Sequence, residues 1–518
     1  MENKTEIEFT RNLRCSQVFT DSSAEYVLPD YNGDIRKILH TSADVRPSGK
    51  FFGGDEVEFS GIVVYEVIYL DEENKLTSVS FTSDYDYSVK CSSETYRDSF
   101  AETLVANYSL RLIGPRKIAT KASVVGNVRI SECCKVFVDG DAFIGDERPE
   151  TMCKHFKIRK SISSECRERE YAESMAKLEG AIAEEVFVIS TSADAVIDEM
   201  SAGDGEVTFR GNLTILAIIK NGDAPAYQRE KIVQIEESVP FAEVSDQMRF
   251  IPTVNVGSLV TSINAHEVGT EVVVSAVMEF SAVGEYNEEG DVISDAYLKS
   301  CAIENKYEDF AYCELLDTIS SCESENGAVQ RSEIDAENVR EVLVLRAVPK
   351  VDSVVCDNDK LTVSGELKYS GVASVTDSEG NLGYVPLKFS LPFERALKVS
   401  GGDSLIPEVT VKSHGTNATF DASKLYASCL LEVTAVVSEE KHISRLALSR
   451  KNPEHPYEKD ASRIIVYYPG AEDNLFLIAK KYKTTALKIA SDNDLEAEVV
   501  ADLDGKISSL GVKKLLIY

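Results

Sequence analysis

The stretch EVTFRGNLTILAIIKN at residues 206–221 carries the pattern that decides the fold of this 518-residue chain. Apolar and polar residues alternate up to Gly211, which is typical of a half-buried strand, and the residues after it are mostly apolar, as in a strand covered on both faces. Similar stretches surround Gly61, 150 residues earlier, and Gly365, 154 residues later. This even spacing predicts a chain built from three repeats.

Each copy continues into a turn and a second strand. The turns lie at residues 71–74, 221–223 and 378–381, and they combine Asn, Asp, Gly, Ser and Glu in a way that suits a β-hairpin. The second strands close 26 to 28 residues after the glycines. Because a glycine inside a strand marks a β-bulge or the close approach of another backbone, we expect one of these at each of the three positions.

The repetition begins before the glycine-centred strands. The tetrapeptide Thr-Ser-Ala-Asp occurs at residues 41–44 and again at residues 191–194, and we expect its hydroxyl groups to hydrogen-bond a turn. Apolar runs at residues 123–130, 271–280 and 425–433 bring each copy to five or six strands. The expected fold is therefore mainly β, with three tandem β-sandwich-like repeats followed by a small α+β domain of the order βααβ.

The segments between these units complete the predicted organisation. Residues 167–183 interleave Ala, Met and Leu with charged residues, which predicts a connecting helix, and the Ser-, Glu- and Asp-rich residues 320–338 predict a solvated linker. Two prolines oppose regular structure in residues 449–460. The expected domains are residues 1–160, 161–310 and 311–450 for the repeats, 451–460 for a linker and 461–518 for the last domain.

Composition limits the partners. The formal net charge is −32 and the pI is about 4.7, so we expect repulsion from nucleic acid and from anionic lipid, and either attraction to basic protein surfaces or simply high solubility. The N-terminal residues show no secretory signal, and no apolar run approaches the roughly 20 residues of a membrane span.

Cysteine and histidine give no sign of a catalytic or metal site. The eleven cysteines lack Cys-x-x-Cys pairs, which favours buried reduced thiols; the vicinal Cys133-Cys134 pair leaves a redox role open. The six histidines stand apart in the sequence, without metal-ligand spacing, and there is no glycine-rich phosphate loop. We therefore expect no enzyme activity, no catalytic residues, no cofactor and no metal.

The last segment predicts a strand, two helices and a closing strand. Residues 463–468 and 514–518 are the expected strands, Asp473 is the expected cap of the first helix, and Thr485 is the expected cap of the second. One face of the first helix is apolar. The residues expected to form the small core are Leu475, Ile478, Leu487, Leu510, Leu515 and Ile517.

Residues 464–517 resemble a LysM domain. The resemblance rests on the first strand, on DNLFLIAKKY at residues 473–482, on Thr484-Thr485 and on LGVKKLLI at residues 510–517, with Glu472 and Phe476 replacing the usual Gly and Trp. LysM domains usually bind N-acetylglucosamine polymers beside their first helix. The resemblance implies a partner- or glycan-binding site at Asp473, Asn474, Leu475, Phe476, Lys480 and Gly511, with a core role for Leu475 and Phe476 as the alternative.

The three repeats resemble SPOCS domains of spore coat assembly proteins in endospore-forming bacteria. Residues 112–118 resemble a segment typical of such repeats; within it Gly-Pro predicts a turn, and Arg116 and Lys117 belong to the turn or form a basic surface contact. The resemblance covers nearly the whole chain. Three SPOCS-like repeats followed by one LysM domain are similar to the spore coat morphogenetic proteins.

That resemblance implies a function and a location. It implies a non-enzymatic scaffold that tethers coat basement-layer proteins, including the coat morphogenetic ATPase, to the forespore from the cytoplasm of the mother cell. There an export signal is not needed and thiols stay reduced. The alternative is a peptidoglycan-binding protein of the spore envelope.

Overall fold

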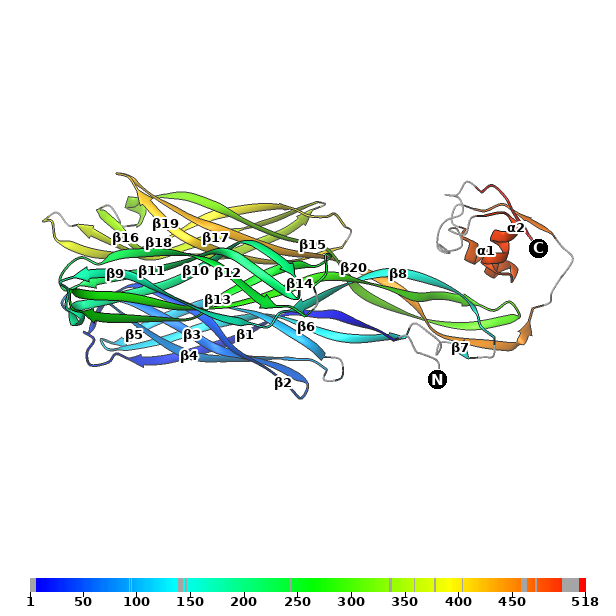
Figure 1. Ribbon diagram of the computed structural model, residues 1–518, viewed down its shortest axis with the longest axis horizontal. Coiled ribbons are helices and arrows are strands. Elements are labelled where there is room, and N and C mark those ends of the chain that lie inside the picture. Colours follow the sequence, from blue (N-terminus) through cyan, green and yellow to red (C-terminus); the bar gives the residue numbers. More distant parts are fainter. Residues whose placement is uncertain are drawn as a thin grey trace.

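The computed structural model describes residues 6–92, 94, 96–137, 143–144, 147–242, 244–334, 338–357, 359–376, 379–402, 404–457, 464–470, 473–495 and 512–518. In these residues the chain is mainly β, as predicted, with antiparallel sheets and two short α-helices near the C-terminus. The molecule is elongated, and the helices lie at one end of it, away from strands β2, β4, β16 and β18 (Figure 1).

Three of the sheets are antiparallel meanders with a glycine-centred strand in the middle. Their strand orders are β2-β3-β4, β10-β11-β12 and β16-β17-β18. The strands are β2 (Ile35–Gly53), β3 (Glu56–Asp71), β4 (Leu76–Lys90), β10 (Val186–Gly203), β11 (Glu206–Asn221), β12 (Tyr227–Pro240), β16 (Val339–Asp357), β17 (Lys360–Thr376) and β18 (Leu382–Lys398).

The glycines combine both predicted features, a bulge and a close backbone approach. Gly211 of β11 is paired with Ile197 of β10, and the register shifts directly after this pair. A Cβ atom on Gly211 would lie 2.0 Å from the carbonyl oxygen of Val196. A Cβ atom on Gly61 would lie 2.5 Å from the carbonyl oxygen of Arg46, and one on Gly365 would lie 2.1 Å from that of Lys350. The same register shift lies beside each glycine. Only glycine fits these three positions without moving the neighbouring strand.

Each meander packs against a second sheet. The first faces β1-β6-β5, the second faces β13-β14-β8 with β9, and the third faces β15-β20-β19 with β7, and each pair encloses its own hydrophobic core. The strands of these sheets are β1 (Glu6–Val27), β5 (Tyr96–Gly114), β6 (Lys117–Phe137), β7 (Phe143–Ile144), β8 (Glu150–Ser163), β9 (Arg167–Glu179), β13 (Arg249–His266), β14 (Gly269–Tyr297), β15 (Cys301–Gln330), β19 (Leu405–Phe420) and β20 (Lys424–Pro456).

The three meanders meet one another around a further hydrophobic core. The first meander contacts the third through β2 and β18, the second contacts the first through β10 and β4, and the third contacts the second through β16 and β12. These contacts close a ring. The side chains in the shared core are Leu39, Ile68, Leu70 and Leu76 from the first meander, Ile189, Ile218 and Ala226 from the second, and Leu343, Val344, Val372 and Tyr384 from the third.

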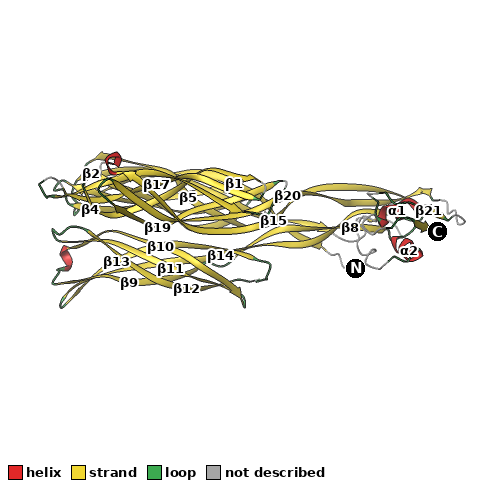
Figure 2. Cartoon of the chain, turned by 90° about the horizontal axis from the view of Figure 1, so that it is seen from above, coloured by secondary structure: helices red, strands yellow, loops and turns green. Residues whose placement is uncertain are grey.

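Long strands extend beyond this ring into an arm. The second half of β14 pairs with β8, and the first half of β15 pairs with the end of β20. The two ladders pack through an apolar cluster that includes Phe156, Val292 and Tyr312. Figures 1 and 2 show this arm, here defined as residues 150–162, 284–297, 301–315 and 438–456, projecting from the ring toward the C-terminal helices.

Three expectations about the connecting segments are wrong. Residues 167–179 form strand β9 rather than a helix, because they pair with β14 and place Met175 in the core of the second sheet pair. Residues 320–330 belong to β15 rather than to a linker, and β20 continues through residues 449–456 despite its prolines. Long-range strand pairing overrides local composition in each case. The predicted division into domains stays a prediction.

The repeated tetrapeptide also lies within strands rather than at turns. Residues 41–44 belong to β2 and residues 191–194 to β10, paired with β3 and β11 respectively. Thr41 is contacted by Tyr108 of β5, whose hydroxyl donates to the carbonyl oxygen of Thr41 at 2.5 Å and lies 3.2 Å from the Thr41 hydroxyl. The predicted turn at Gly114-Pro115 is confirmed, because β5 and β6 join there as a hairpin.

The C-terminal domain, here called the tail domain, has the predicted element order. It comprises β21 (Ile465–Tyr467), α1 (Leu475–Tyr482), α2 (Ala486–Asp492) and β22 (Leu515–Ile517), with β21 and β22 paired antiparallel. Thr485 caps α2 as predicted, since its side chain accepts a hydrogen bond from the amide of Lys488. The cap of α1 is Asn474 rather than Asp473, because the Asn474 side chain accepts from the amide of Leu477.

The core of the tail domain differs in part from the predicted one. Leu475, Ile478, Leu515 and Ile517 are buried as expected. Leu487 is 67% exposed, so its predicted place in the core is wrong: α2 turns Ile489 and Ala490 inward instead. Leu510 lies outside the described residues.

Candidate functional site

The residues expected to form a binding site in the tail domain lie against the arm. Leu475 and Phe476 are each only 1% exposed. Phe476 contacts Tyr297 at the end of β14 in an edge-on arrangement, with 5.2 Å between the ring centroids. The apolar cluster of the tail domain also takes in Met152 of β8. Leu475 and Phe476 are therefore buried, as the alternative of a core role expects. Tyr297 of the arm provides part of the cover of Phe476.

Polar contacts surround this aromatic pair. The Tyr297 hydroxyl donates to the carbonyl oxygen of Thr484 at 2.7 Å, and the Asn474 side-chain amide lies 3.9 Å from the sulfur of Met152. Lys480 Nζ contacts a carboxylate oxygen of Asp295 at 2.5 Å. Burial raises the pKa of Tyr297 above its usual value, which keeps the hydroxyl protonated as a donor. We call Asn474, Phe476, Lys480 and Thr484 the docking face.

Asp295 is held by the arm as well as by Lys480. Its carboxylate accepts a hydrogen bond from the hydroxyl of Tyr307 at 2.8 Å and lies 3.3 Å from the side-chain nitrogen of Asn305. It also accepts from the amide of Ala296. Asp295 is 9% exposed, and its carboxylate has these partners within the arm in addition to Lys480.

The remaining predicted residues of the tail site have other positions. Asp473 accepts hydrogen bonds from the Tyr467 hydroxyl and the Gly470 amide, both at 2.7 Å, and these bonds lower the pKa of its carboxyl. Asp473 thus fixes the connection between β21 and α1, outside the docking face. Gly511 lies outside the described residues.

Arg116 and Lys117 are partnered within the first sheet pair. The guanidinium of Arg116 donates to the carbonyl oxygens of Asn32 and Pro29 and to the carboxylate of Asp34, at 2.7 to 2.9 Å. This arrangement holds the chain between β1 and β2 in place. Lys117 pairs with Glu25 at the surface. The guanidinium of Arg116 is thus engaged by its own chain. This favours a role of Arg116 and Lys117 in the turn over a basic surface contact.

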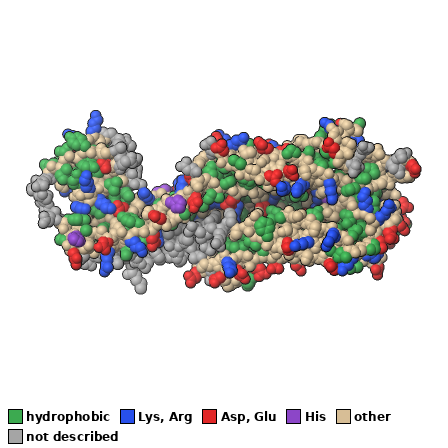
Figure 3. Space-filling model, turned by 180° about the vertical axis from the view of Figure 1, so that it is seen from behind, with side chains coloured by type: hydrophobic (Ala, Val, Ile, Leu, Met, Phe, Trp, Pro, Cys, Tyr) green, Lys and Arg blue, Asp and Glu red, His purple; other side chains and the backbone are tan. Residues whose placement is uncertain are grey.

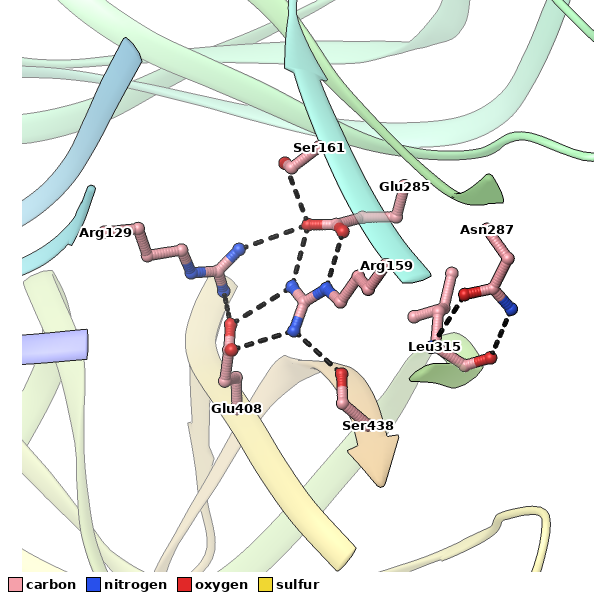
Figure 4. Close-up of polar contacts among 8 residues, drawn as sticks. All are labelled: Arg129, Arg159, Ser161, Glu285, Asn287, Leu315, Glu408 and Ser438. Atoms are coloured by element: carbon pink, nitrogen blue, oxygen red, sulfur yellow. Dashed lines mark hydrogen bonds and ion pairs between the residues drawn. The ribbon is translucent and has the colours of Figure 1, made fainter. Parts of the chain in front are cut away.

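A second polar site, here called the neck cluster, lies where the arm leaves the ring (Figure 4). Arg159 of β8 is 2% exposed and donates two hydrogen bonds to Glu285 of β14, at 2.8 and 2.9 Å. It also contacts Glu408 of β19 at 2.9 Å. Arg129 of β6 bridges the same two carboxylates. The other members are Ser161 and Ser438.

The neck cluster joins all three sheet pairs. Its two guanidinium groups and two carboxylates come from β6, from β8 and β14, and from β19. Burial alone would lower the pKa of Arg159, but its contacts with Glu285 and Glu408 raise it. Each charge faces opposite charges, so the cluster holds the three parts together and leaves no unpaired charge to act on a ligand. Beside it Asn287 clamps the backbone of Leu315 through two hydrogen bonds, of 2.8 and 2.9 Å.

Sequence reasoning missed a histidine site. His414 of β19 lies 2.7 Å from Asp194 of β10 and 3.0 Å from Glu432 of β20, one carboxylate at each ring nitrogen. Burial lowers the pKa of His414, but the two carboxylates outweigh it and raise the pKa to about 9. The imidazole is therefore a cation that joins two sheet pairs. The repeated Thr-Ser-Ala-Asp was the available signal, because Asp194 is its last residue.

The described part of the chain presents no metal centre or membrane helix. Among those residues, no group of three or more His, Cys, Asp and Glu side chains is placed to hold a metal ion. None of the helices there is long and apolar enough to cross a membrane.

The cysteines differ in burial. Cys91, Cys301 and Cys429 are buried, whereas Cys153 and Cys166 are exposed, so the expected burial of cysteines holds only in part.

The acidic charge is spread rather than concentrated on the visible face. Figure 3 shows Lys and Arg side chains interspersed with Asp and Glu along the ring and the arm. No protein-family model, curated protein or solved structure matches this chain.

Proposed function

We propose that this chain is a non-enzymatic scaffold of spore coat assembly. Three SPOCS-like repeats and a LysM-like tail domain tether coat basement-layer proteins, including the morphogenetic ATPase, to the forespore from the mother-cell cytoplasm. The observation that carries the proposal is the shared design of the three meanders. In each, a central glycine faces a carbonyl oxygen of the preceding strand beside a bulge, at intervals of 150 and 154 residues.

The same intervals relate residues of the core that the meanders share. Leu39, Ile189 and Leu343 are 150 and 154 residues apart, and so are Ile68, Ile218 and Val372. Three units of this shared design surround the common core. Such an arrangement suits a protein that holds several copies of coat components together.

The tail domain supports the LysM-like part of the proposal. Its elements follow the order strand, helix, helix, strand, and Asn474 and Thr485 cap the two helices. A domain of this size at the end of the arm stands apart from the ring (Figure 2). In this position it can contact a partner while the ring contacts others.

A peptidoglycan-binding role is the second candidate. Tyr468 is 72% exposed, and Leu477 is also exposed on the same small domain. An exposed aromatic ring suits the flat faces of sugar rings. These residues do not belong to the docking face, so glycan binding does not require the tail domain to leave the arm.

The first experiment is to image a fluorescent fusion in sporulating cells, with and without residues 460–518. A shell around the forespore that disperses on truncation is the expected result. A uniform signal from both proteins would contradict the proposal, because the scaffold must concentrate at the forespore surface.

The second experiment separates the two candidates. The full chain, a Tyr468→Ala variant and the chain without residues 460–518 are incubated with insoluble peptidoglycan and sedimented. Retention that requires the tail domain and falls for Tyr468→Ala favours the glycan-binding role. Equal, low retention of all three proteins favours the protein scaffold.

A further inference from the structure

The docking face of the tail domain holds a short piece of the same chain. The piece is Asp295-Ala296-Tyr297, the last three residues of β14. Asp295 contacts Lys480, and Tyr297 contacts both the ring of Phe476 and the carbonyl oxygen of Thr484. An acidic and an aromatic side chain on one strand thus account for three of the contacts between the arm and the tail domain.

The spacing of these two residues matters. In a strand, residues two positions apart point to the same side, so Asp295 and Tyr297 can face the tail domain together. The register of β14 against β8 shifts between Ile293 and Asp295, which marks a bulge just before the pair. The strand ends directly afterwards. The pair therefore projects from the tip of a rigid ladder, much as a short linear ligand would.

We infer that the docking face is a recognition site for an extended strand that carries a carboxylate two residues before an aromatic side chain. In this state the site is occupied in cis by β14, and a protein partner that presents the same pair replaces β14. The inference deepens the proposed function and rests on it for the existence of such a partner. It concerns a protein strand and not a glycan, because a glycan offers no carboxylate-and-aromatic pair in this arrangement.

Loss of the tail domain would uncover Tyr297 and Met152 of the arm but would leave Asp295 partnered. Asp295 keeps its hydrogen bonds from Tyr307 and Asn305 when Lys480 leaves, so its carboxylate is not stranded. The chain between Tyr457 and Ile464 connects the arm to the tail domain. Lys483 Nζ of the tail domain lies 4.1 Å from the centroid of the Tyr457 ring. On the tail side, Phe476 loses the aromatic contact with Tyr297. A replacement strand restores that contact.

The occupied state is measurable on the unaltered chain. A carbodiimide couples an amine to a carboxylate only when the two are in contact, so it converts the Lys480–Asp295 pair into a covalent link that peptide mass spectrometry identifies. The Lys441–Glu314 pair, between β20 and β15 within the arm, serves as an internal reference. Tyr297→Ala should lower the Lys480–Asp295 yield at least fivefold and leave the reference unchanged. An unchanged yield would mean that Tyr297 does not hold the tail domain in place.

Recognition in trans is tested with two variants. Asp295→Asn with Tyr297→Ala frees the docking face of one chain, and removal of residues 460–518 frees the strand tip of the other, which carries an isotope label and whose Lys441–Glu314 link reports an intact arm. The two chains are mixed at about 0.5 mM, because contacts within one chain act at millimolar effective concentration. They should form a link between Lys480 of one chain and Asp295 of the other. The control adds Tyr297→Ala to the labelled chain.

Each outcome of the trans experiment decides the inference. A link above the control level supports recognition of the acidic and aromatic pair. A level equal to the control overturns it, since both surfaces are then free and fail to bind. The localisation experiment does not depend on this result: a shell around the forespore without a trans link leaves the scaffold proposal standing and removes only the recognition site.

Discussion

The Nδ1 atom of His414 lies 2.7 Å from a carboxylate oxygen of Asp194, although 220 residues separate the two in the chain. Asp194 also accepts a hydrogen bond from the amide of Gly415. Strands β10 and β19 are therefore joined by a charged contact between the second and third sheet pairs. Its strength depends on the proton of His414.

Stability should fall as the pH rises through the titration of His414. Its pKa is about 9 in the folded chain and about 6.5 in the unfolded chain, so folding favours the protonated form. The stabilisation is fully present below pH 6.5 and is lost between pH 6.5 and 9, by at most about 3 kcal/mol. Urea unfolding of the chain at pH 6, 7.5 and 9 measures it.

His414→Gln is the control for this titration. It keeps hydrogen-bonding atoms but cannot be charged, so it should unfold at lower urea concentration at pH 6 and show a smaller change toward pH 9. Groups that also titrate toward pH 9 include the thiol of Cys322, whose pKa is raised by burial and by Glu432; the carboxyl of Glu432 does not, because His414 lowers its pKa. An identical pH profile in the variant would assign the loss to those groups.

His40 should give the opposite pH dependence. Burial, together with nearby Arg346 and Lys388, lowers its pKa to about 3, and among the described residues its Nε2 atom has no hydrogen-bond partner. The folded chain therefore keeps the imidazole neutral. The contribution of His40 to the free energy of unfolding is therefore complete above pH 6.5 and is lost as the pH falls toward 3. The loss is about 2 kcal/mol at pH 5.

Comparison of the chain with His40→Leu between pH 7 and pH 5 isolates this effect. Thermal unfolding of the variant should change less over that interval, because its apolar side chain carries no proton. Most carboxylates titrate below this range and contribute equally to both proteins. Parallel curves for the two proteins would show that His40 is not the titrating group.

Alanine at the central glycines should destabilise the meanders. The Cβ atom in Gly211→Ala would lie 2.0 Å from the carbonyl oxygen of Val196, so strand β10 must move, at a cost of about 2 to 3 kcal/mol. Gly203→Ala, at the end of β10, is the matched control, since its Cβ meets nothing within 4 Å. Urea midpoints of both variants measure the difference, and equal midpoints would contradict the close approach.

Removal of Arg159 from the neck cluster should be more costly than removal of a surface arginine. Arg159→Met leaves the fully buried carboxylate of Glu285 with fewer partners, which we expect to cost about 3 to 5 kcal/mol. Arg210→Met breaks an exposed pair with Glu236 and should cost less than about 1 kcal/mol. Chemical unfolding compares the two, and similar small losses would show that the neck cluster contributes little.

Much of the β architecture could be predicted from local pattern. The meanders are defined by alternating residues before Gly61, Gly211 and Gly365, by apolar residues after these glycines, and by turn residues beyond them. A glycine within a strand also predicts the bulge and the close approach. The capping role of Thr485 could be predicted in the same way. These features depend on residues close together in sequence, so composition and spacing are enough.

The tertiary structure alone decided the rest. Residues 167–179 have helical composition but pair with β14, and the prolines of residues 449–456 lie in β20. In both cases a long partner strand supplies hydrogen bonds that cannot be predicted from local propensity. The pairs His414–Asp194, Arg159–Glu408 and Lys480–Asp295 join residues 185 to 249 positions apart. The sequence by itself determined the glycine-centred strands of the three meanders. Packing of distant strands determined strand β9, the extent of β15 and β20, and which charges meet, since such contacts exist only once the chain has folded.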